Sequence, residues 1–238
     1  MKAVILAGGK GTRLMPLTGS IPKPMIKLID KPVMEYIIEL LKKHGFTEIA
    51  VTLGYLPDSI IEYFGDGSRF GVKLTYFIED TPLGTAGSVK ECQNFLSDDF
   101  LVISGDCFTE INLSEAVKFH RDRKSIFTVI CQPHPNPVGL GVLKTDSFGV
   151  ITEFIEKPDD PSPSLINTGI YIINKKVLDR IPKGFYDFGK QLLPSMTGEL
   201  YAYADYSYWS DIGTLVSYYE TNCVLAKKYS EKIGENAV

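Results

Sequence analysis

The first residues constrain the fold more than any other part of the chain. The run Lys2–Ala7 is apolar, β-branched and of strand length, and it is followed at once by the glycine-rich turn Gly8–Gly11. In an open α/β sheet, such a turn places free backbone N–H groups at the carboxyl edge, where these sheets bind ligands. Glycine lets the backbone approach a phosphate with no side chain in between. Arg13 and Lys23 follow on the same loop, so we interpret it as a phosphate-binding loop with its own positive charges.

Two better-known phosphate-binding loops do not match this one. Val4 stands where a Walker loop has its leading glycine, and Gly11 stands where it has serine or threonine. A dinucleotide-binding fingerprint needs a third glycine where this chain has Leu14, and the prolines that follow disfavour a helix there. The alternative is an ordinary tight turn, but the glycines together with Arg13 and Lys23 favour phosphate binding.

Strand-like and helix-like segments alternate through the first half of the chain. Apolar runs of strand length lie at 3–7, 49–53, 73–78 and 100–104. Helical periodicity follows them at 33–44, 60–64, 86–96 and 113–120. We expect Gly45 to end the first helix, Asn112 to cap the last, and His120 to lie on the surface of that last helix. This order of elements predicts an α/β fold with a doubly wound, mostly parallel, Rossmann-like mixed sheet.

The second half of the chain has a different pattern. Its strands are predicted at 126–132, 141–144, 150–155, 169–173 and 200–204, and its helices at 185–196 and 215–228. Tyr218, Tyr219 and Val224 are expected on the inner face of the last helix. Because crossover helices are missing, we expect a smaller β-rich subdomain that forms one wall of a cleft. The single domain 1–238 would then comprise 1–124, 125–228 and a frayed tail at 229–238.

Charge and cysteine pattern exclude several classes of function. A net charge of −4 argues against a nucleic-acid partner. The four cysteines form no CxxC pair, so neither a zinc site nor a redox motif is indicated. No apolar run approaches membrane-spanning length, and the first is too short for a signal peptide. We therefore expect a cytoplasmic protein without membrane partners; Tyr206, Tyr208 and Tyr218 are candidates for an interface in a homo-oligomer.

Two aspartates are candidates for a metal site. Asp106 directly follows an apolar strand, so it should point into the ligand crevice, and Asp211 precedes the last helix. Mg²⁺ commonly takes only one or two protein carboxylates and completes its coordination with phosphate and water. The alternatives are that Asp106 is a turn residue and that Asp211 caps the last helix, a role that Thr214 could fill instead.

Polar residues in the second half suit a sugar phosphate. Glu156 and Asn167 could bond to sugar hydroxyls, and Lys157 could hold a phosphate as a compact point charge. The alternative for Glu156 and Lys157 is a solvated turn pair.

The segment Glu79–Gly87 suits a nucleobase. It follows the third strand and opens a helix, and its glycines leave room for a flat ring. Glu79 or nearby carbonyl groups could then read the edge of the base. The alternative is an ordinary helix start with Thr85 as the N-cap, and the two roles can coexist.

These segments, in this order, resemble the sugar-1-phosphate nucleotidyltransferases. The resemblance covers nearly the whole chain and is carried by Leu6–Thr18, Pro22–Pro24, Pro82–Gly87, Gly105–Asp106, Glu156–Pro158, Asn167–Gly169 and Trp209–Gly213. It is strongest toward mannose-1-phosphate guanylyltransferases and the related glucose-phosphate and heptose-phosphate enzymes. One departure is Leu140, where many relatives have tyrosine before the glycine.

The resemblance implies catalytic roles for Arg13, Lys23 and Asp106, and a metal-binding role for Asp106 and Asp211. Arg13 would hold the triphosphate and its pyrophosphate leaving group, and Lys23 would neutralise the phosphates at the reacting centre. Asp106 and Asp211 would bind Mg²⁺. The residues implied at the nucleotide are Leu6, Ala7, Gly8, Gly9, Gly11, Thr12, Glu79, Pro82, Gly84 and Thr85. The residues implied at the sugar phosphate are Gly141, Glu156, Lys157, Asn167 and Thr168.

The expected reaction is nucleotidyl transfer. A sugar-1-phosphate oxygen attacks the α-phosphorus of a nucleoside triphosphate, and pyrophosphate leaves. The attacking oxygen is already anionic, so the protein must supply positive charge and orientation rather than a general base. Resemblance favours GTP and mannose-1-phosphate; the alternatives are glucose-1-phosphate thymidylyl-, uridylyl- or cytidylyltransferase and heptose-1-phosphate guanylyltransferase.

Two rival functions belong to other classes. One is a catalytically silent regulatory subunit that binds a nucleotide sugar without turning it over; such a module could lose Arg13, Lys23, Asp106 and Asp211, which this chain retains. The other is a glycosyltransferase. Those enzymes often carry an Asp-x-Asp metal motif, which this sequence lacks.

Overall fold

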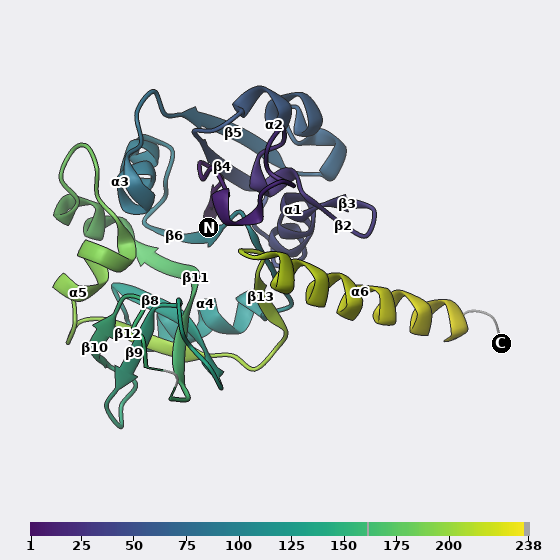
Figure 1. Cartoon of the computed structure of the whole chain (residues 1–238). Helices are drawn as coiled ribbons and strands as arrows, with labels where there is room; N and C mark the ends of the chain where they lie inside the picture. Colours follow the sequence, from purple (N-terminus) through teal and green to yellow (C-terminus); the bar gives the residue numbers. More distant parts are fainter. Residues whose placement is uncertain (161, 236–238) are drawn as a thin grey trace.

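The first half of the chain forms the parallel part of a nine-stranded sheet (Figure 1). The computed structural model describes residues 1–160 and 162–235. The parallel strands are β1 (Lys2–Leu6), β4 (Glu48–Leu53), β5 (Lys73–Ile78) and β6 (Asp99–Ser104). The helices of this half are α1 (Val33–Lys43), α2 (Pro57–Phe64), α3 (Gly84–Glu91) and α4 (Leu113–Asp122). The spatial order β5-β4-β1-β6 means that the chain reverses its direction of winding at β1, as in doubly wound folds.

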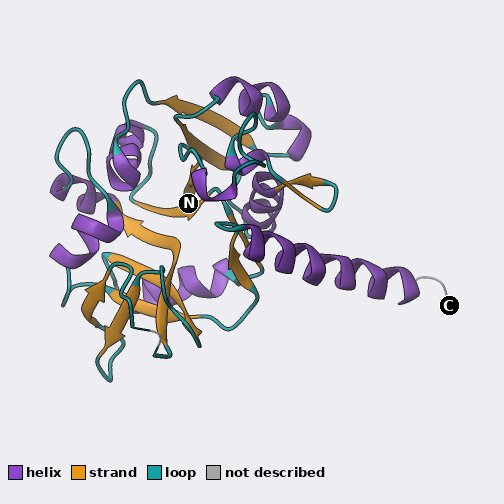
Figure 2. Cartoon of the chain, in the orientation of Figure 1, coloured by secondary structure: helices purple, strands orange, loops and turns teal. Residues whose placement is uncertain are grey.

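The second half extends this sheet with antiparallel strands, which Figure 2 shows gathered below the parallel part. The antiparallel strands are β8 (Phe127–His134), β9 (Val142–Thr145), β10 (Ile151–Ile155) and β11 (Ser164–Asn174), and β12 (Tyr201–Ala204) pairs with β8 in parallel at the edge. The long strand β11 pairs with β6, β8 and β9, and so joins the two halves into one sheet. The predicted α/β fold, with a doubly wound sheet and a smaller β-rich part, is confirmed.

Shorter elements complete the chain. The remaining strands are β2 (Lys27–Leu28), β3 (Lys31–Pro32), β7 (Cys107–Thr109) and β13 (Trp209–Asp211). The 3₁₀ turns are η1 (Thr12–Leu14), η2 (Lys23–Met25), η3 (Ser68–Phe70), η4 (Cys92–Asn94) and η5 (Lys175–Arg180). The last helical elements are a π-helical turn η6 (Phe188–Leu192), α5 (Leu193–Ser195) and α6 (Leu215–Glu235). Within the described ranges, no helix is long and apolar enough to cross a membrane.

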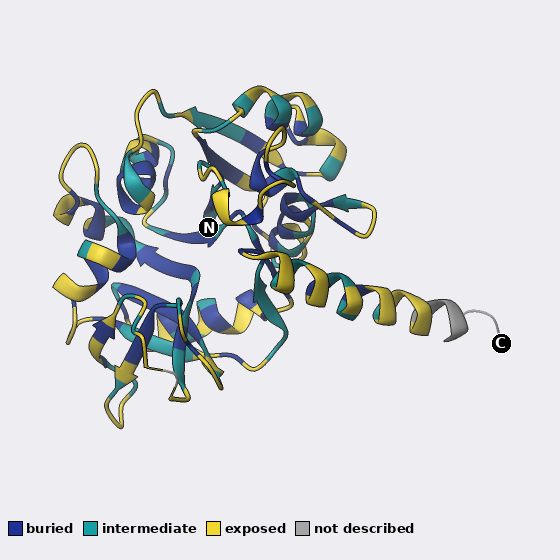
Figure 3. Cartoon of the chain, in the orientation of Figure 1, coloured by how far each residue is buried: buried dark blue, intermediate teal, exposed yellow. Residues whose placement is uncertain are grey.

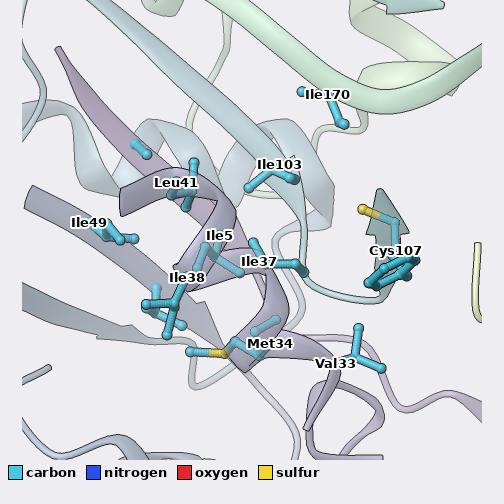
Figure 4. Close-up of a cluster of buried hydrophobic side chains, with 14 of the residues drawn as sticks. Ile5, Val33, Met34, Ile37, Ile38, Leu41, Ile49, Ile103, Cys107 and Ile170 are labelled. Carbon is cyan, nitrogen blue, oxygen red and sulfur yellow. The ribbon is translucent and has the colours of Figure 1, made fainter. Parts of the chain in front are cut away.

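The alternation of side chains along β1 divides the interior into two cores. Ile5 faces a cluster that includes Ile37 and Leu41 of α1, shown in Figure 4. Val4 faces the opposite cluster, which includes Val89 of α3. Strands buried on both faces need continuous apolar sequence, and β1 and β6 have it. Figure 3 shows the central strands in dark blue, whereas the outer face of α6 is exposed.

Several helix ends follow local sequence signals, as predicted. Gly45 follows α1 with φ +82°, a conformation that favours glycine. The Asn112 side chain accepts hydrogen bonds from the backbone N–H groups of Ser114 and Glu115, and so caps α4. Thr214 Oγ1 accepts a hydrogen bond from the Ser217 N–H at 3.1 Å, so Thr214 rather than Asp211 caps α6.

Two segments of the second half differ from the sequence prediction. The strand predicted at 169–173 is longer, since β11 begins at Ser164 and its Leu165 and Ile166 pair with β9. The helix predicted over 185–196 forms only from Phe188 to Ser195, in π and α turns. Its expected first turn is instead bonded to α3, as described below.

The last helix corrects three expectations. The predicted tail at 229–238 is helical as far as Glu235, and 236–238 lie outside the described residues. Tyr219 was predicted on the inner face, but it is 69% exposed; Thr221 and Leu225 are the buried positions. Among the tyrosines expected at an interface, Tyr206 is exposed, whereas Tyr208 and Tyr218 pack against the core.

The prediction that His120 lies on a helix surface is wrong. The ring is buried, because β8 passes alongside α4 and its Thr128 Oγ1 lies 2.8 Å from His120 Nδ1. Its Nε2 lies 3.8 Å from Asp99 Oδ1, and none of the described residues forms a hydrogen bond with it.

Candidate active site

The loop after β1 lies at the carboxyl edge of the parallel strands, as predicted. Leu14 is fully buried and anchors the loop in the core. Thr18 Oγ1 donates a hydrogen bond to the Gly11 carbonyl at 2.8 Å and closes the loop on itself. Gly11 has φ +63°, and a β-carbon there would come within 3.1 Å of the Lys23 side chain. The loop therefore holds its shape through its own contacts.

Gly9 is a glycine that the fold does not require. No heavy atom lies within 4 Å of the place where its β-carbon would be, and its φ lies outside the left-handed region. Its backbone therefore faces open space, which suits the close approach of a ligand.

The pairing of two short strands brings the two predicted aspartates together. β7 pairs with β13 so that Asp211 lies opposite Cys107, and the Ile212 N–H bonds to the Asp106 carbonyl at 2.9 Å. Gly105 allows this turn to pass close to β1, because a β-carbon there would lie 2.7 Å from the Leu6 carbonyl oxygen.

The Lys23 ammonium lies between these two carboxylates. It is buried, donates a hydrogen bond to Asp106 Oδ2, and lies 3.2 Å from Asp211 Oδ1. The other oxygen of Asp106 accepts a hydrogen bond from Ser104 Oγ at 2.5 Å. Arg13 is further out, with its Nη2 3.9 Å from Asp211 Oδ2.

Proton affinities within this cluster reflect burial and the neighbouring charges. Burial alone would lower the pKa of Lys23, but the Asp106 and Asp211 carboxylates outweigh burial and raise it. Burial alone would raise the pKa of Asp106, yet Lys23 and the Ser104 hydroxyl keep it below its usual value. Burial and the nearby Asp106 charge raise the pKa of Asp211. The two carboxylates therefore have different proton affinities although they share one ammonium group.

The residues present fit a divalent metal of the magnesium type. Two carboxylates converge on one cation, and hard oxygen ligands of this kind are the ones that Mg²⁺ prefers. In the described part of the chain, no group of three or more His, Cys, Asp or Glu side chains could hold a metal. A metal bound here would therefore depend on phosphate and water for most of its coordination.

Two clefts meet at the cluster of Lys23, Asp106 and Asp211. The first lies beside the loop after β1, and we call it the glycine cleft. It has a volume of about 300 Å³. The expected nucleotide residues that line it are Leu6, Gly8, Gly9, Glu79, Pro82, Gly84 and Thr85. Of the others expected there, Ala7 is buried behind it, and Gly11 and Thr12 are not among its lining residues. Five further residues line it that sequence reasoning missed: Thr52, Ser88, Ser104, Phe185 and Asp187.

The second cleft lies against β11, and we call it the β11 cleft. It has a volume of about 200 Å³. All the residues expected at a sugar phosphate line it: Gly141, Glu156, Lys157, Asn167 and Thr168. Arg13 and Asp211 line this cleft rather than the glycine cleft, and Trp209 and Leu140 do so too. Ser104 and Asp106 line both clefts, so the two meet there.

A bulge in β11 sets the direction of two of these side chains. The pairing of β11 with β8 shifts between Asn167 and Ile170, and Gly169 in the bulge has φ +74°. Asn167 Nδ2 donates to the Tyr171 hydroxyl at 2.8 Å. Thr168 is buried and its hydroxyl donates to the Ile130 carbonyl at 2.7 Å. Thr168 therefore lines the cleft mainly through its backbone.

Glu156 is enclosed by two glycines. A β-carbon on Gly189 would lie 2.5 Å from Glu156 Oε2, and one on Gly141 would lie 3.1 Å from it. The Lys157 Nζ lies 3.6 Å from Glu156 Oε1, and Lys157 has φ +51°. The absence of two side chains therefore leaves room for this carboxylate, with the ammonium group beside it.

The alternative considered for this segment, an N-cap at Thr85, is not what the structure shows. The Tyr186 carbonyl oxygen accepts hydrogen bonds from the Ala86 and Gly87 N–H groups at 3.0 and 2.9 Å, and so caps the helix. Thr85 Oγ1 instead donates to Asp187 Oδ2 at 2.9 Å and accepts from the Phe188 N–H. The segment 184–189 therefore lies against α3 at one end and against Glu156 at the other.

Comparison with known proteins agrees with this architecture. The family model described as "Nucleotidyl transferase" matches residues 2–228. A UTP–glucose-1-phosphate uridylyltransferase from Synechocystis sp. is 42% identical over 240 residues, covering 92% of this chain and 62% of that protein. A mannose-1-phosphate guanylyltransferase from Mycobacterium tuberculosis is 34% identical over 218 residues, covering 89% and 61%. The chain thus spans about six tenths of the length of these curated relatives.

A solved structure matches over almost its full length. The crystal structure of HddC from Yersinia pseudotuberculosis superposes with a TM-score of 0.85 at 31% identity, covering 94% of this chain and 99% of that one. The same protein complexed with GMP-PN gives a TM-score of 0.84.

Proposed function

Because this chain belongs to the nucleotidyl transferase family, we propose that it joins a nucleoside triphosphate to a sugar-1-phosphate and releases pyrophosphate. One observation carries the proposal: two clefts of different chemistry meet at Asp106, beside a buried lysine. The glycine cleft holds the nucleotide, and the β11 cleft holds the sugar phosphate. The reacting phosphorus then lies at their junction.

The residues at the junction carry out the chemistry by positioning and charge. The sugar phosphate is already an anion, so the barrier is the approach of one anion to another. Lys23 and Arg13 provide positive charge there, and Lys157 provides it at the sugar phosphate. Mg²⁺ held by Asp106 and Asp211 would supply further positive charge at the phosphates. The oxygen of the sugar phosphate then displaces pyrophosphate from the α-phosphorus, in line with the leaving oxygen.

We further propose GTP and mannose-1-phosphate as the substrate pair. Guanine presents two adjacent N–H donors at its edge, and a carboxylate such as Glu79 is an acceptor only. Glu79 Oε2 accepts a hydrogen bond from the Leu83 N–H at 3.2 Å, and its second lone pair together with Oε1 can accept from the two donors of the base. The relatives from Mycobacterium tuberculosis and Xenopus laevis are named for the mannose-1-phosphate reaction and support this choice.

A second candidate pair is UTP and glucose-1-phosphate. The relative from Synechocystis sp. has the higher identity, 42%, and is named for that reaction. Uracil offers one N–H between two carbonyl groups. A carboxylate that accepts from this N–H therefore also lies close to a carbonyl oxygen of the base, which it repels. The Glu79 carboxylate thus suits the edge of guanine better than the edge of uracil.

The test is a panel assay for pyrophosphate release. Purified protein with Mg²⁺ is incubated with each of GTP, UTP, dTTP and CTP, combined with mannose-, glucose- and heptose-1-phosphates. We expect release with GTP and mannose-1-phosphate at the highest kcat/KM; a higher value for UTP and glucose-1-phosphate would reverse the choice. Nucleotide-sugar binding without release from any pair would favour the regulatory-subunit alternative.

A further inference from the structure

Phe185 is an exposed aromatic residue on the wall of the glycine cleft. It belongs to neither buried apolar cluster, and 58% of its surface is exposed. It lines the cleft together with Pro82, Gly84 and Glu79. The ring therefore does not stabilise the fold by packing in a core, and another role has to account for an apolar ring at this place.

The backbone that carries Phe185 is firmly held. The next residue, Tyr186, donates its N–H to the Leu83 carbonyl at 2.8 Å and accepts from two N–H groups of α3. Gly84 has φ +70°, and a β-carbon there would lie 2.7 Å from the Tyr186 carbonyl oxygen and 3.2 Å from Phe185 Cε2. The ring is thus presented from a fixed segment, beside a stretch of α3 without a side chain.

We propose that Phe185 is a base-binding residue whose ring stacks on the nucleobase of the bound nucleoside triphosphate. This inference rests on the proposed function in one respect, namely that the nucleotide occupies the glycine cleft. The other groups there are suited to a flat ring: the backbones of Gly8 and Gly84, and the apolar side chains of Leu6 and Pro82. Every base has a π-face, so stacking raises affinity without selecting the base. Selection is left to groups at the base edge, such as Glu79.

Direct binding measurements test the role of the ring. Dissociation constants are measured by isothermal titration calorimetry for GTP, for UTP and for inorganic tripolyphosphate, which has no base. We expect Phe185→Ala to weaken both nucleotides about tenfold and to leave tripolyphosphate unchanged. Phe185→Trp should retain wild-type affinity, and Phe185→Leu should fall between. Phe148→Ala is the matched control, since Phe148 is 70% exposed on the turn between β9 and β10.

Other outcomes overturn the inference. Wild-type nucleotide affinity in Phe185→Ala would exclude stacking, and an equal loss for tripolyphosphate would show a disturbed cleft instead of a lost base contact. Turnover is measured separately. A Phe185-dependent nucleotide affinity without pyrophosphate release would refute the proposed function and leave the inference intact. Pyrophosphate release together with an unchanged nucleotide affinity in Phe185→Ala would refute the inference and leave the proposed function intact. Absence of nucleotide binding by the wild type would refute both.

Discussion

The glycine cleft and the β11 cleft share Ser104 and Asp106 but are built in different ways. The glycine cleft lies at the ends of parallel strands and at the start of α3, and it combines three glycines with the apolar side chains of Leu6, Pro82 and Phe185. The β11 cleft is formed by side chains with charge or amide groups, which a bulged antiparallel strand and its neighbours bring together. Apolar groups and bare backbone accept a flat ring of the right shape, whereas fixed charges demand complementary groups. In the proposed function, directed polar contacts therefore hold the sugar phosphate, and the nucleobase is held mainly by apolar contact, with Glu79 at its edge.

The largest effect should come from the residue at the junction. Lys23→Ala removes the ammonium between two carboxylates, and we expect kcat to fall at least about a hundredfold, equivalent to about 3 kcal/mol or more. It should also lower the free energy of unfolding, by at most about 3–5 kcal/mol, since two half-buried carboxylates lose their partner. Steady-state assays and urea titrations measure the two effects.

Lys118→Ala is the control for that change, because Lys118 is an exposed lysine on α4 and lines neither cleft. It should keep kcat within about twofold of wild type and change stability by less than about 0.5 kcal/mol. A Lys23→Ala enzyme with wild-type kcat would remove Lys23 from the mechanism.

A smaller effect, confined to the β11 cleft, is expected from Gly189→Ala. The new β-carbon would lie 2.5 Å from Glu156 Oε2, so the carboxylate must move. We expect the KM for the sugar phosphate to rise about tenfold, in line with the sensitivity of bound substrates to displacements of about 1 Å. The KM for the nucleotide should stay unchanged. Equal changes in both would show that the two clefts are not independent in this respect.

The corresponding glycine-to-alanine substitution in the glycine cleft is Gly9→Ala. No protein atom lies near the new methyl group, so the free energy of unfolding should stay the same or rise by about 0.4–1 kcal/mol. The KM for the nucleotide should rise several-fold, because the methyl group would occupy space meant for the ligand, and the KM for the sugar phosphate should not change. If Gly9→Ala binds nucleotide normally, that backbone does not contact the ligand.

The smallest effect is a pH dependence of stability that we expect from His120. This residue of α4 contacts Thr128 of β8, where the two halves of the chain pack together. Burial lowers the pKa of His120, Arg121 adds to this, and the Asp99 carboxylate offsets it only in part. The unfolded chain therefore takes up a proton first as pH falls below about 6.5, so stability is complete above that pH and declines below it. One proton contributes at most about 1.4 kcal/mol per pH unit.

Urea titrations between pH 7.5 and 5 measure this decline, with His120→Gln as the comparison. The free energy of unfolding should fall less steeply with decreasing pH in His120→Gln than in the wild type. The comparison is needed because both proteins also contain His44 and His134. Parallel curves for the two proteins would mean that His120 does not titrate differently on folding.

Sequence patterns predicted those features that depend on neighbours in the chain. The strand before Gly8, the cap at Asn112 and the stop at Gly45 are all local. The cap of α3 was not predicted because it comes from Tyr186, about a hundred residues away. His120 was misplaced for the same reason, since only the folded sheet brings β8 against it.

The same limit applies to the candidate site. Motif spacing predicted Asp106 and Asp211, and the pairing of β7 with β13 explains why they meet. Thr52 and Phe185 were missed because neither belongs to a distinctive motif. A polar residue at the end of β4 was the one available signal for Thr52, since carboxyl ends of neighbouring strands share an edge.

The segment 184–189 has a thermodynamic consequence, because it touches α3 through Tyr186 and Glu156 through Gly189. These contacts exist without a ligand, so little conformational entropy has to be lost from the segment when a substrate binds on either side of it. Each substrate would then find its side of the segment already in place, whichever of the two arrives first.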